Sequence, residues 1–375
     1  MADILFATLA AGGNLPPALG IAAELLQQGH RVRFLGHAEQ AAAVEGTGAE
    51  FIPYRHAAPL HPAEAVAAPR QFAAMLRVFG DEGIGRDLVA EAGRGPADAV
   101  VVDCLLLGAI RAAARAGLPT AVLVHSFLGF FDGPFRRGPM GAALALKGLP
   151  ARRVMSSAGR ILVCADPLLD PAAGAHLPAG RPSTVWTGAV VEGAAREMPA
   201  AQPPRVLASL STTAFPGQGQ VLQRILDAAA TLPLELVVTT GPAVNPAALN
   251  APRNATVLRY VDHAELMPGC SAVIGHGGHS TTMRALAQGL PMLVLPMHPL
   301  MDQPMVGKAV RDAGAGLVLS RKSRSSEIAE ALTSVLGSDG YAAAAARVGE
   351  RLRGAAGAKT GARAVLDFAR ESAKG

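Results

Sequence analysis

Short apolar runs alternate with helical patterns from the beginning of the chain. A continuous apolar run at 4–7 predicts a strand that is buried on both faces. After a turn of glycines and prolines at 11–17, apolar residues recur at helical spacing until Gly29 ends the helix. The run at 31–35 predicts the next strand, so this segment is one β-α-β unit.

The same alternation continues along the rest of the chain. A strand at 99–102 leads to Asp103, and a strand at 120–124 leads to His125, with a helix between them. Further strands are expected at 206–209, 234–238, 272–274 and 292–295, and the stretch 325–373 is expected to be helical throughout. Alternating strands and helices predict parallel sheets covered by helices on both faces, with ligands bound at the carboxyl ends of the strands.

The length of the chain and one proline-rich stretch predict two domains. At roughly 150 residues per domain, 375 residues suggest two domains. The composition shifts at 192–204, which is rich in Ala, Gly and Pro and is typical of a linker. We therefore expect an α/β chain of two doubly wound, Rossmann-like domains that face each other across a cleft. The expected boundaries are 1–195, a linker at 196–203, and 204–375, with a C-terminal helix that packs back on the first domain.

Composition excludes several classes of protein. Half of the residues are hydrophobic and only 17% are charged, which excludes a disordered chain. Aromatic residues make up 4%, and the densest basic stretch, 321–324, is short and is interpreted as a solvated loop, so no nucleic-acid partner is expected. Three widely spaced cysteines form no disulfide or metal pattern. No apolar run reaches the ~20 residues that span a bilayer, and a cytoplasmic protein is expected.

One turn between a strand and a helix carries the strongest chemical signal. Gly277 and Gly278 allow a ligand to approach the backbone closely. Ser280 and Thr281 open the following helix, whose free amides and dipole favour an anion. His276 can add a donor to a phosphate oxygen. Together these residues predict a diphosphate site; a tight turn with a capping serine and a structural histidine is the alternative.

The wider spacing resembles the donor-site signature of the GT-B glycosyltransferases, in the family of bacterial antibiotic glycosyltransferases and plant UDP-sugar transferases. The shared pattern over 271–319 is His-Gly-Gly-x-Ser/Gly-Thr, then Ala-Leu, Gly-x-Pro, a strand, and Asp-Gln. The resemblance implies an acceptor-binding first domain, a donor-binding second domain, and an inverting transfer of a sugar. No metal is expected, because the sequence shows neither a D-x-D pair nor a His/carboxylate cluster, and no cofactor is expected besides the nucleotide-sugar co-substrate.

The resemblance also assigns donor-binding roles. Asp302 and Gln303 would bind the sugar hydroxyls, and Val261 would contact the nucleobase. The complete implied set is Ser211, Thr212, Val261, His276, Gly277, Gly278, Ser280, Thr281, Asp302 and Gln303.

The general base of the family is missing here. Many members read Gly-His-x-x-Pro in the first loop, whereas this chain has Gly13 at the histidine position, followed by Asn14. Asp103 matches the carboxylate that orients the missing histidine. His125 is the first candidate for another base, since its ordinary pKa of ~6.5 suits that role; Asp132 is the second and Asp103 the third. A hydrogen-bonded structural histidine is the alternative for His125.

Arg284 is a second departure from the family. UDP-glucose enzymes usually carry Glu at this position to bridge the ribose hydroxyls, and members that use dTDP-deoxysugars often lack it. Arg284 therefore favours a dTDP-sugar donor over a UDP-sugar. An outward-facing arginine without a role is the alternative.

An apolar acceptor pocket is predicted in the first domain. Phenylalanines cluster after His125 in a glycine- and proline-broken segment, and others fall at helical spacing before it. The predicted acceptor-binding residues are Gly13, Phe72, Phe79, Phe127, Phe130, Phe131, Phe135 and Met140; ordinary core packing is the alternative. The low charge of these stretches and the missing base both favour a hydrophobic, aromatic natural-product aglycone.

Other functions remain as alternatives. A nucleotide-sugar-binding homologue without activity is suggested by Gly13, and a nucleotide-sugar epimerase or hydrolase could use the same fold. An oxidoreductase is disfavoured because no G-x-G-x-x-G follows the first strand. The expected partners are the small-molecule aglycone and the nucleotide-sugar, and a homodimer is compatible with the sequence.

Overall fold

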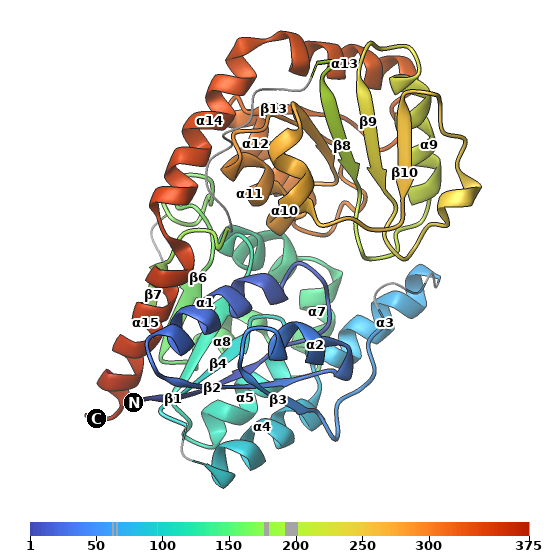
Figure 1. Cartoon of the computed structure of the whole chain (residues 1–375). Coiled ribbons are helices and arrows are strands. Elements are labelled where there is room, and N and C mark those ends of the chain that lie inside the picture. The colour runs from blue at the N-terminus through green and yellow to red at the C-terminus, as the bar shows by residue number, and fades with distance from the viewer. Residues whose placement is uncertain (62–63, 65–66, 96, 176–179, 192–201, 375) are drawn as a thin grey trace. The chain divides into compact units, whose positions relative to one another are not determined.

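The chain forms two compact units (Figure 1). The computed structural model describes residues 1–61, 64, 67–95, 97–175, 180–191 and 202–374. The first unit contains 1–61, 67–190 and 355–375, and the second contains 62–66 and 191–354. Most of the expected linker, 196–203, lies outside the described residues.

A parallel sheet forms the centre of the first unit. Its described strands lie in the order β3-β2-β1-β4-β5-β6-β7. They are β1 (Asp3–Ala7), β2 (Arg31–Gly36), β3 (Glu50–Pro53), β4 (Ala99–Asp103), β5 (Thr120–Val124), β6 (Arg160–Val163) and β7 (Ser183–Trp186). Every residue of β4 and β5 is buried, because helices cover both faces of the sheet. The continuous apolar runs of the sequence are therefore the central strands.

Helices cover the two faces of this sheet. The longer ones are α1 (Leu15–Gln27), α3 (Ala68–Phe79), α4 (Glu82–Arg94), α5 (Leu107–Arg115), α7 (Pro139–Leu146) and α15 (Gly357–Ser372). Shorter turns are η1 (Ala38–Gln40), α2 (Ala41–Glu45), α6 (Leu128–Phe130), η2 (Phe131–Phe135) and α8 (Ala151–Met155). On one face, α1 and α15 enclose a core that includes the stacked rings of Phe6 and Phe34. Gly29, at a φ of +78°, follows the end of α1, as predicted.

The last helix packs within the first unit. Arg160, in β6, donates from Nη1 to the carbonyl of Ala364 at 3.1 Å and from Nη2 to Glu371 at 2.6 Å. Its guanidinium also lies 5.6 Å from the ring centroid of Phe368. Gly361 leaves room for Ile21 of α1, since a Cβ there would lie 2.7 Å from that side chain. The C-terminal segment is thus part of the core that surrounds β1 and β4.

The second unit is built in the same way. Its described strands lie in the order β10-β9-β8-β11-β12-β13, all parallel. They are β8 (Arg205–Ser209), β9 (Glu235–Thr239), β10 (Ala255–Leu258), β11 (Ala272–Gly275), β12 (Met292–Val294) and β13 (Gly316–Val318). The helices are α9 (Gln218–Ala229), α10 (His263–Leu266), α11 (His279–Ala287), α12 (Gln303–Asp312), α13 (Ser325–Gly337) and α14 (Asp339–Gly354), with short turns η3 (Pro246–Ala248) and η4 (Met267–Gly269). One core joins α9 and α13 to the sheet, while α11 packs against α14.

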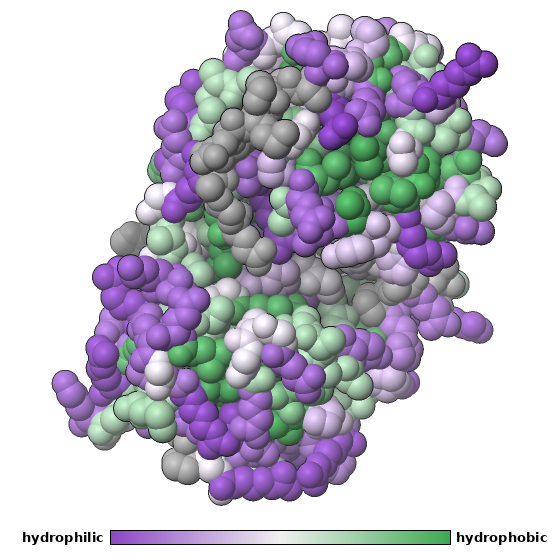
Figure 2. Space-filling model, viewed as in Figure 1, coloured by the Kyte–Doolittle hydropathy of each residue, from purple (hydrophilic) through white to green (hydrophobic). Residues whose placement is uncertain are grey.

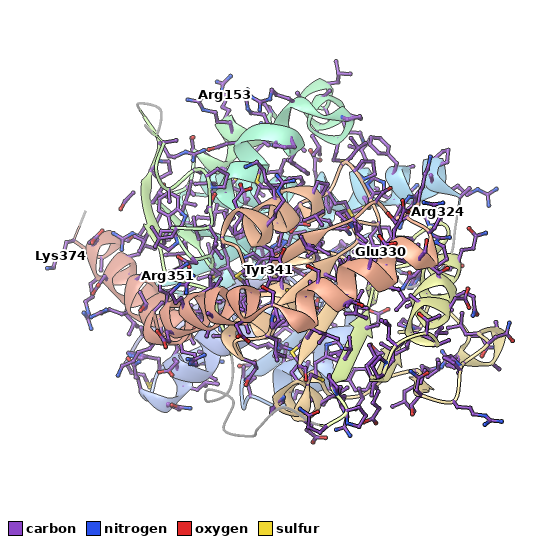
Figure 3. The ribbon with its side chains drawn as sticks, turned by 90° about the horizontal axis from the view of Figure 1, so that it is seen from above. Arg153, Arg324, Glu330, Tyr341, Arg351 and Lys374 are labelled. Carbon is purple, nitrogen blue, oxygen red and sulfur yellow. The ribbon has the colours of Figure 1, made fainter. Side chains whose placement is uncertain are left out.

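The stretch 325–373, which was predicted to be helical throughout, is helical but is divided into three helices. In Figure 3, Arg324 marks the beginning of α13, Glu330 lies within it, and Tyr341 lies near the beginning of α14. Between α14 and α15, Ala356 takes a φ of +45°, which an α-helix does not allow. The alanine-rich pattern predicts helix correctly, and glycines mark the divisions, because Gly337 and Gly354 are the last residues of α13 and α14.

The strands that the sequence identified are present, with shifted ends. The structure adds strands that the sequence pattern did not reveal, among them β7 and β13, which are short and only partly buried. Among the described residues no helix is long and apolar enough to cross a membrane. Hydrophilic residues cover most of the face shown in Figure 2, and hydrophobic residues reach the surface in patches on each unit.

Candidate active site

Asp103 and His125 form a hydrogen-bonded pair at the carboxyl edge of the first sheet. Asp103 ends β4 and pairs in register with Leu123 of β5, so His125 follows two residues further along. Nδ1 of His125 lies 3.0 Å from Oδ2 of Asp103, whose side chain is only 1% exposed. A carboxylate at Nδ1 fixes the proton of a neutral imidazole on that nitrogen. Nε2 is therefore the ring nitrogen that remains available to accept a proton.

Burial and the neighbouring polar groups shift the pKa of His125 in opposite directions. Burial is the largest single influence and would lower the pKa of His125, but the charges of Asp103 and Cys104 and the hydrogen bonds to both residues together hold the pKa well above the usual 6.5. Sγ of Cys104 lies 3.6 Å from the same Nδ1, and burial raises the pKa of this thiol. The donor atoms of the three residues lie within 4.8 Å of one another, close enough to bind one metal ion. The predicted absence of a metal therefore stays a prediction.

Asn14 lies against the same carboxylate. Its Nδ2 donates to Oδ2 of Asp103 at 3.1 Å and to the carbonyl of Leu9 at 3.0 Å. The second oxygen of Asp103 accepts from the backbone of Leu105 at 2.9 Å. Asn14 thus connects the loop after β1 to the pair, whereas Gly13 beside it is exposed. The structure gives Asn14 a positioning role rather than an acid–base role, because an amide does not titrate.

Asp132, the second candidate base, is already engaged. Its carboxylate forms an ion pair with Arg181, whose side chain is 4% exposed. Asp132 also lies in the π-helical turn η2, whereas the sequence predicted a loop for this segment. His125 is therefore the better base on geometric grounds.

The predicted acceptor-binding phenylalanines and Met140 divide into two groups. Phe130, Phe131 and Phe135 form one cluster, with ring centroids 5.2 to 5.9 Å apart, and Phe79 of α3 joins it at 6.3 Å from Phe135. The ring of Phe131 also lies edge-on to His125, at 6.0 Å. The other group consists of Phe127, which is fully buried as core, and the half-buried Phe72 and Met140 on the packed helices α3 and α7.

Asp170 anchors the segment that carries these rings, and no sequence pattern indicated this role. Its buried carboxylate accepts the backbone N–H groups of Leu128 and Gly129 at 2.8 and 3.0 Å. It also accepts Nε1 of Trp186 in β7 at 3.0 Å. Asp170 therefore fixes the chain that follows His125. An aspartate near a tryptophan in sequence could have suggested such a bond, but nothing linked either residue to 128–129.

In the second unit, the turn from β11 to α11 has the predicted form. Gly277 takes a φ of +81°, and a Cβ there would lie 2.7 Å from the carbonyl oxygen of Gln303. Gly278 occupies the N-cap position of α11, so no side chain caps the helix. The first amides, including those of Ser280 and Thr281, have no partner within the helix, which is typical of a site for an anion. The loop after β12 closes this turn from the other side.

His276 is neutral in this environment. Burial lowers its pKa to about 4, although a hydrogen bond from the ring to the backbone carbonyl of Ser209 favours the protonated form. Its Nδ1 is buried and has no hydrogen-bond partner among the described residues. A neutral ring that donates to Ser209 through Nε2 carries no proton on Nδ1. To donate to a phosphate oxygen, as predicted, His276 must gain a proton or change its tautomer when the ligand binds.

Gln303 holds the loop after β12 by hydrogen bonds, a role that the sequence did not predict. It is 2% exposed, and its Oε1 accepts the backbone N–H groups of Met297 and His298 at 2.7 and 2.9 Å. It therefore holds the loop after β12, which leaves only its amide nitrogen for a sugar hydroxyl. Asp302 is half-buried at the N-cap position of α12.

The loop after β8 is held by its own side chains. Oγ of Ser211 accepts the backbone N–H of Thr213 at 2.9 Å, and Nε2 of Gln218 donates to the Ser211 carbonyl at 3.1 Å. The side chain of Thr212 is exposed. Nη1 of Arg321 joins this loop to the loop after β12, because it donates to the carbonyls of Pro216 at 3.0 Å and Met297 at 3.1 Å. The interpretation of 321–324 as only a solvated loop therefore missed a structural contact.

The residues after β10 lie beside α11. Val261 is half-buried, and Asp262 caps α10. Nε2 of His263 lies 3.3 Å from Oγ1 of Thr239 at the end of β9. Burial and the positive charge of Arg284 both lower the pKa of His263. The charge of Arg284 therefore lies close enough to influence the residues that follow β10.

The order of the strands arranges the predicted donor residues in a row. Along the carboxyl edge, Val261 follows β10, Ser211 follows β8, His276 follows β11 and Asp302 follows β12. With ~4.8 Å between neighbouring strands, this row spans about 19 Å. The predicted contacts to a nucleobase, a diphosphate and a sugar therefore follow one another in the chemical order of a nucleotide-sugar.

Comparison with known proteins finds a family model that matches most of the second unit. A family model described as "Erythromycin biosynthesis protein CIII-like, C-terminal domain" matches residues 223–356. The elloramycin glycosyltransferase ElmGT of Streptomyces olivaceus is 35% identical over 151 residues, which are 40% of this chain and 38% of that protein. The aligned segments span about two fifths of the length of the curated relatives that the chain matches.

Solved structures extend the likeness of fold to the whole chain. The glycotransferase of kitacinnamycin superposes with a TM-score of 0.80 at 23% identity and covers 98% of this chain and 99% of that one. The glycosyltransferase VinC in complex with dTDP has a TM-score of 0.71 at 21% identity over the full length of both chains. The predicted fold class, two α/β domains with parallel sheets, is confirmed.

Proposed function

We propose that this protein is a glycosyltransferase. The premise is that the chain has the GT-B fold and matches the model of an erythromycin biosynthesis protein CIII-like C-terminal domain. The protein would transfer a sugar from a nucleotide-sugar to a hydrophobic natural-product acceptor. The observation that carries the proposal is the uncapped N-terminus of α11, preceded by His276 and Gly277. This arrangement is suited to a diphosphate, and it lies in the segment that matches the family model.

The second unit would hold the donor along its strand order. The diphosphate would accept hydrogen bonds from the first amides of α11, and His276 would add one donor after it gains a proton. A side chain at Gly277 would collide with the carbonyl of Gln303 at the beginning of α12, so this turn requires glycine, which also leaves the backbone open to the ligand. As the sugar leaves the diphosphate, these preorganised donors stabilise the negative charge that develops on it. This assignment agrees with VinC, a fold neighbour whose structure holds dTDP.

The first unit would supply the general base. Nε2 of His125 would take the proton from the acceptor hydroxyl while that oxygen forms its bond to the anomeric carbon. The bond between the anomeric carbon and the diphosphate oxygen breaks at the same time, on the opposite face, which inverts the configuration. Asp103 holds the ring and stabilises the imidazolium that results. The pair would replace the histidine that is absent at Gly13.

The acceptor would be apolar and aromatic. The cluster of Phe130, Phe131 and Phe135 lies next to His125; its rings are only 3 to 7% exposed, so they would give the acceptor an apolar wall beside the base rather than free ring faces. A phenol needs less help to lose its proton than an aliphatic alcohol, which suits a base that departs from the family pattern. The presence of Arg284, at a position where UDP-glucose enzymes usually carry Glu, favours a dTDP-sugar as the donor.

Calorimetric titration with dTDP, UDP and NAD tests the donor site first. We expect binding of dTDP or UDP and none of NAD; binding of NAD alone, or of none of the three, would contradict the proposal. A transfer assay with polyphenol and polyketide acceptors then tests the activity, with and without a chelator. Loss of activity in the chelator would contradict metal independence, and donor cleavage without transfer would favour a hydrolase or epimerase.

A further inference from the structure

The loop after β12 holds His298 in a fixed position. Oε1 of the buried Gln303 accepts the backbone N–H groups of both Met297 and His298. Arg321 adds a bond to the carbonyl of Met297 at 3.1 Å. The backbone at Met297 and His298 is therefore held by hydrogen bonds from two side chains, which fixes the position from which the His298 side chain extends.

The hydrogen bonds of the His298 ring define its tautomer. The backbone N–H of Leu300 donates to Nδ1 at 3.2 Å, so Nδ1 carries no proton. Burial and the positive charge of Arg321 both lower the pKa of His298, which keeps the ring neutral near pH 7. A neutral imidazole with a bare Nδ1 has its proton on Nε2. His298 thus presents one N–H donor, and no described residue accepts from it.

The ring lies where two loops of the candidate donor site meet. Its centroid is 6.0 Å from that of Phe215, which belongs to the loop after β8. Arg321 joins the same two loops through the carbonyls of Pro216 and Met297. Because β8 and β12 are the two neighbours of β11, the loops that carry Phe215 and His298 lie on either side of the turn that carries His276 and leads into α11.

We propose that His298 is a sugar-binding residue whose Nε2–H donates a hydrogen bond to an oxygen of the transferred sugar. This inference rests on the proposed function. It assigns the sugar rather than the nucleoside because β12 lies on the opposite side of β11 from β10, where Val261 and His263 lie. A neutral donor suits a hydroxyl oxygen, whereas the diphosphate has the amides of α11.

Two substitutions separate this role from a purely structural one. His298→Asn keeps an acceptor for the Leu300 N–H near the position of Nδ1 but loses the Nε2–H. His298→Gln places an amide N–H near the position of Nε2 but gives up the bond from Leu300. We would measure the affinity of the wild type and both variants for dTDP and for dTDP-glucose by calorimetry, or for the uridine pair if the wild type prefers it.

We expect His298→Asn to lower the affinity for the nucleotide-sugar by roughly three- to tenfold while the affinity for the diphosphate alone stays unchanged. His298→Gln should keep most of the discrimination. Equal loss of both ligands in either variant, or a larger loss in Gln than in Asn, would overturn the inference in favour of a loop-positioning role. If the wild type binds the nucleotide-sugar and both variants bind it with the same affinity, the role of His298 is wrong but the proposed function stands. If the wild type binds neither nucleotide, the proposed function and the role of His298 are both wrong. Equal thermal unfolding midpoints would show that the variants fold.

Discussion

Nδ1 of His125 lies 3.0 Å from Oδ2 of Asp103, although 22 positions separate the two residues in the chain. The contact exists because β4 and β5 are neighbouring parallel strands, so residues that follow them meet at one edge of the sheet. The same aspartate would orient the histidine that this chain lacks at Gly13. In this chain the carboxylate of Asp103 is paired with His125 instead.

His125→Gln should lower kcat by about 10²- to 10⁴-fold with the affinity for the donor unchanged, because the general base is lost while the second unit is untouched. Glutamine keeps polarity and approximate size. The measurement is steady-state transfer together with calorimetry for the nucleotide. A rate equal to that of the wild type would remove His125 from the mechanism.

The pH dependence follows from the raised pKa of His125. A base acts only when it is deprotonated, so kcat/KM should be low below the raised pKa and rise as the pH passes through it. Asp103→Asn removes the charge that raises this pKa. The rising limb should then move to lower pH while the plateau falls, since the ring is no longer held in the correct tautomer. If the rising limb of the kcat/KM profile stays at the same pH in Asp103→Asn, a group other than His125 controls it.

The sequence predicted the sheets well and the contacts within the site less well. Central strands such as β4 and β5 are buried on both faces, so their apolar runs are unambiguous. The glycine turn at Gly277 was predictable because few residues other than glycine accept its φ. The pairing of Asp103 with His125 was not, since it depends on which strands are neighbours. Asp170 was missed for the same reason, because its partners come from separate segments.

His276 should titrate far below an ordinary histidine. Because its pKa in the folded protein is about 4 and that of the unfolded chain is ~6.5, the unfolded state binds an extra proton between these values. Its contribution to stability is therefore present above pH 6.5 and is lost as the pH falls from 6.5 towards 4. Proton NMR of the ring in the free protein measures the pKa directly; a value near 6.5 would contradict the burial that the structure shows.

Diphosphate binding should raise the pKa of His276, because phosphate oxygens favour the protonated ring. Binding of dTDP in the range between pH 4 and 6.5 should then be accompanied by proton uptake, which calorimetry in buffers of different ionisation enthalpy detects. His276→Ala should weaken dTDP or UDP binding by about tenfold and abolish the uptake. Unchanged affinity for both nucleotides would refute the role of His276 in the donor site.

Gly277→Ala should abolish nucleotide binding. The added Cβ would lie 2.7 Å from the carbonyl oxygen of Gln303 at a φ of +81°, so the turn or the loop after β12 must move. Gly314→Ala is the matched control, because its φ is +70° and its nearest neighbour would be a methyl group at 3.7 Å. The control should lose only about 1–2 kcal/mol of stability through backbone strain and keep its affinity. Equal affinities of the two variants would show that the turn does not bind the ligand.

Asp170→Ala should lower stability and weaken acceptor binding. Its carboxylate accepts the N–H groups of Leu128, Gly129 and Trp186, and their loss leaves buried donors unpaired at a cost of about 3 kcal/mol. Denaturant unfolding measures the loss, and the acceptor KM should rise while dTDP affinity stays unchanged. Asp170→Asn keeps an acceptor oxygen and should fall between the alanine variant and the wild type. An unchanged acceptor KM would separate Asp170 from the acceptor site.

Arg284 should set the choice of nucleotide. Its positive charge acts on His263 beside the residues after β10, which is the end of the row where the nucleoside is expected. A cation at this position offers no acceptor for the two ribose hydroxyls of uridine, so the wild type should bind dTDP more tightly than UDP. Arg284→Glu supplies that acceptor and should shift the preference towards UDP by roughly tenfold. Parallel titrations of both proteins with both nucleotides measure the shift, and a wild type that prefers UDP would reverse the assignment of the donor.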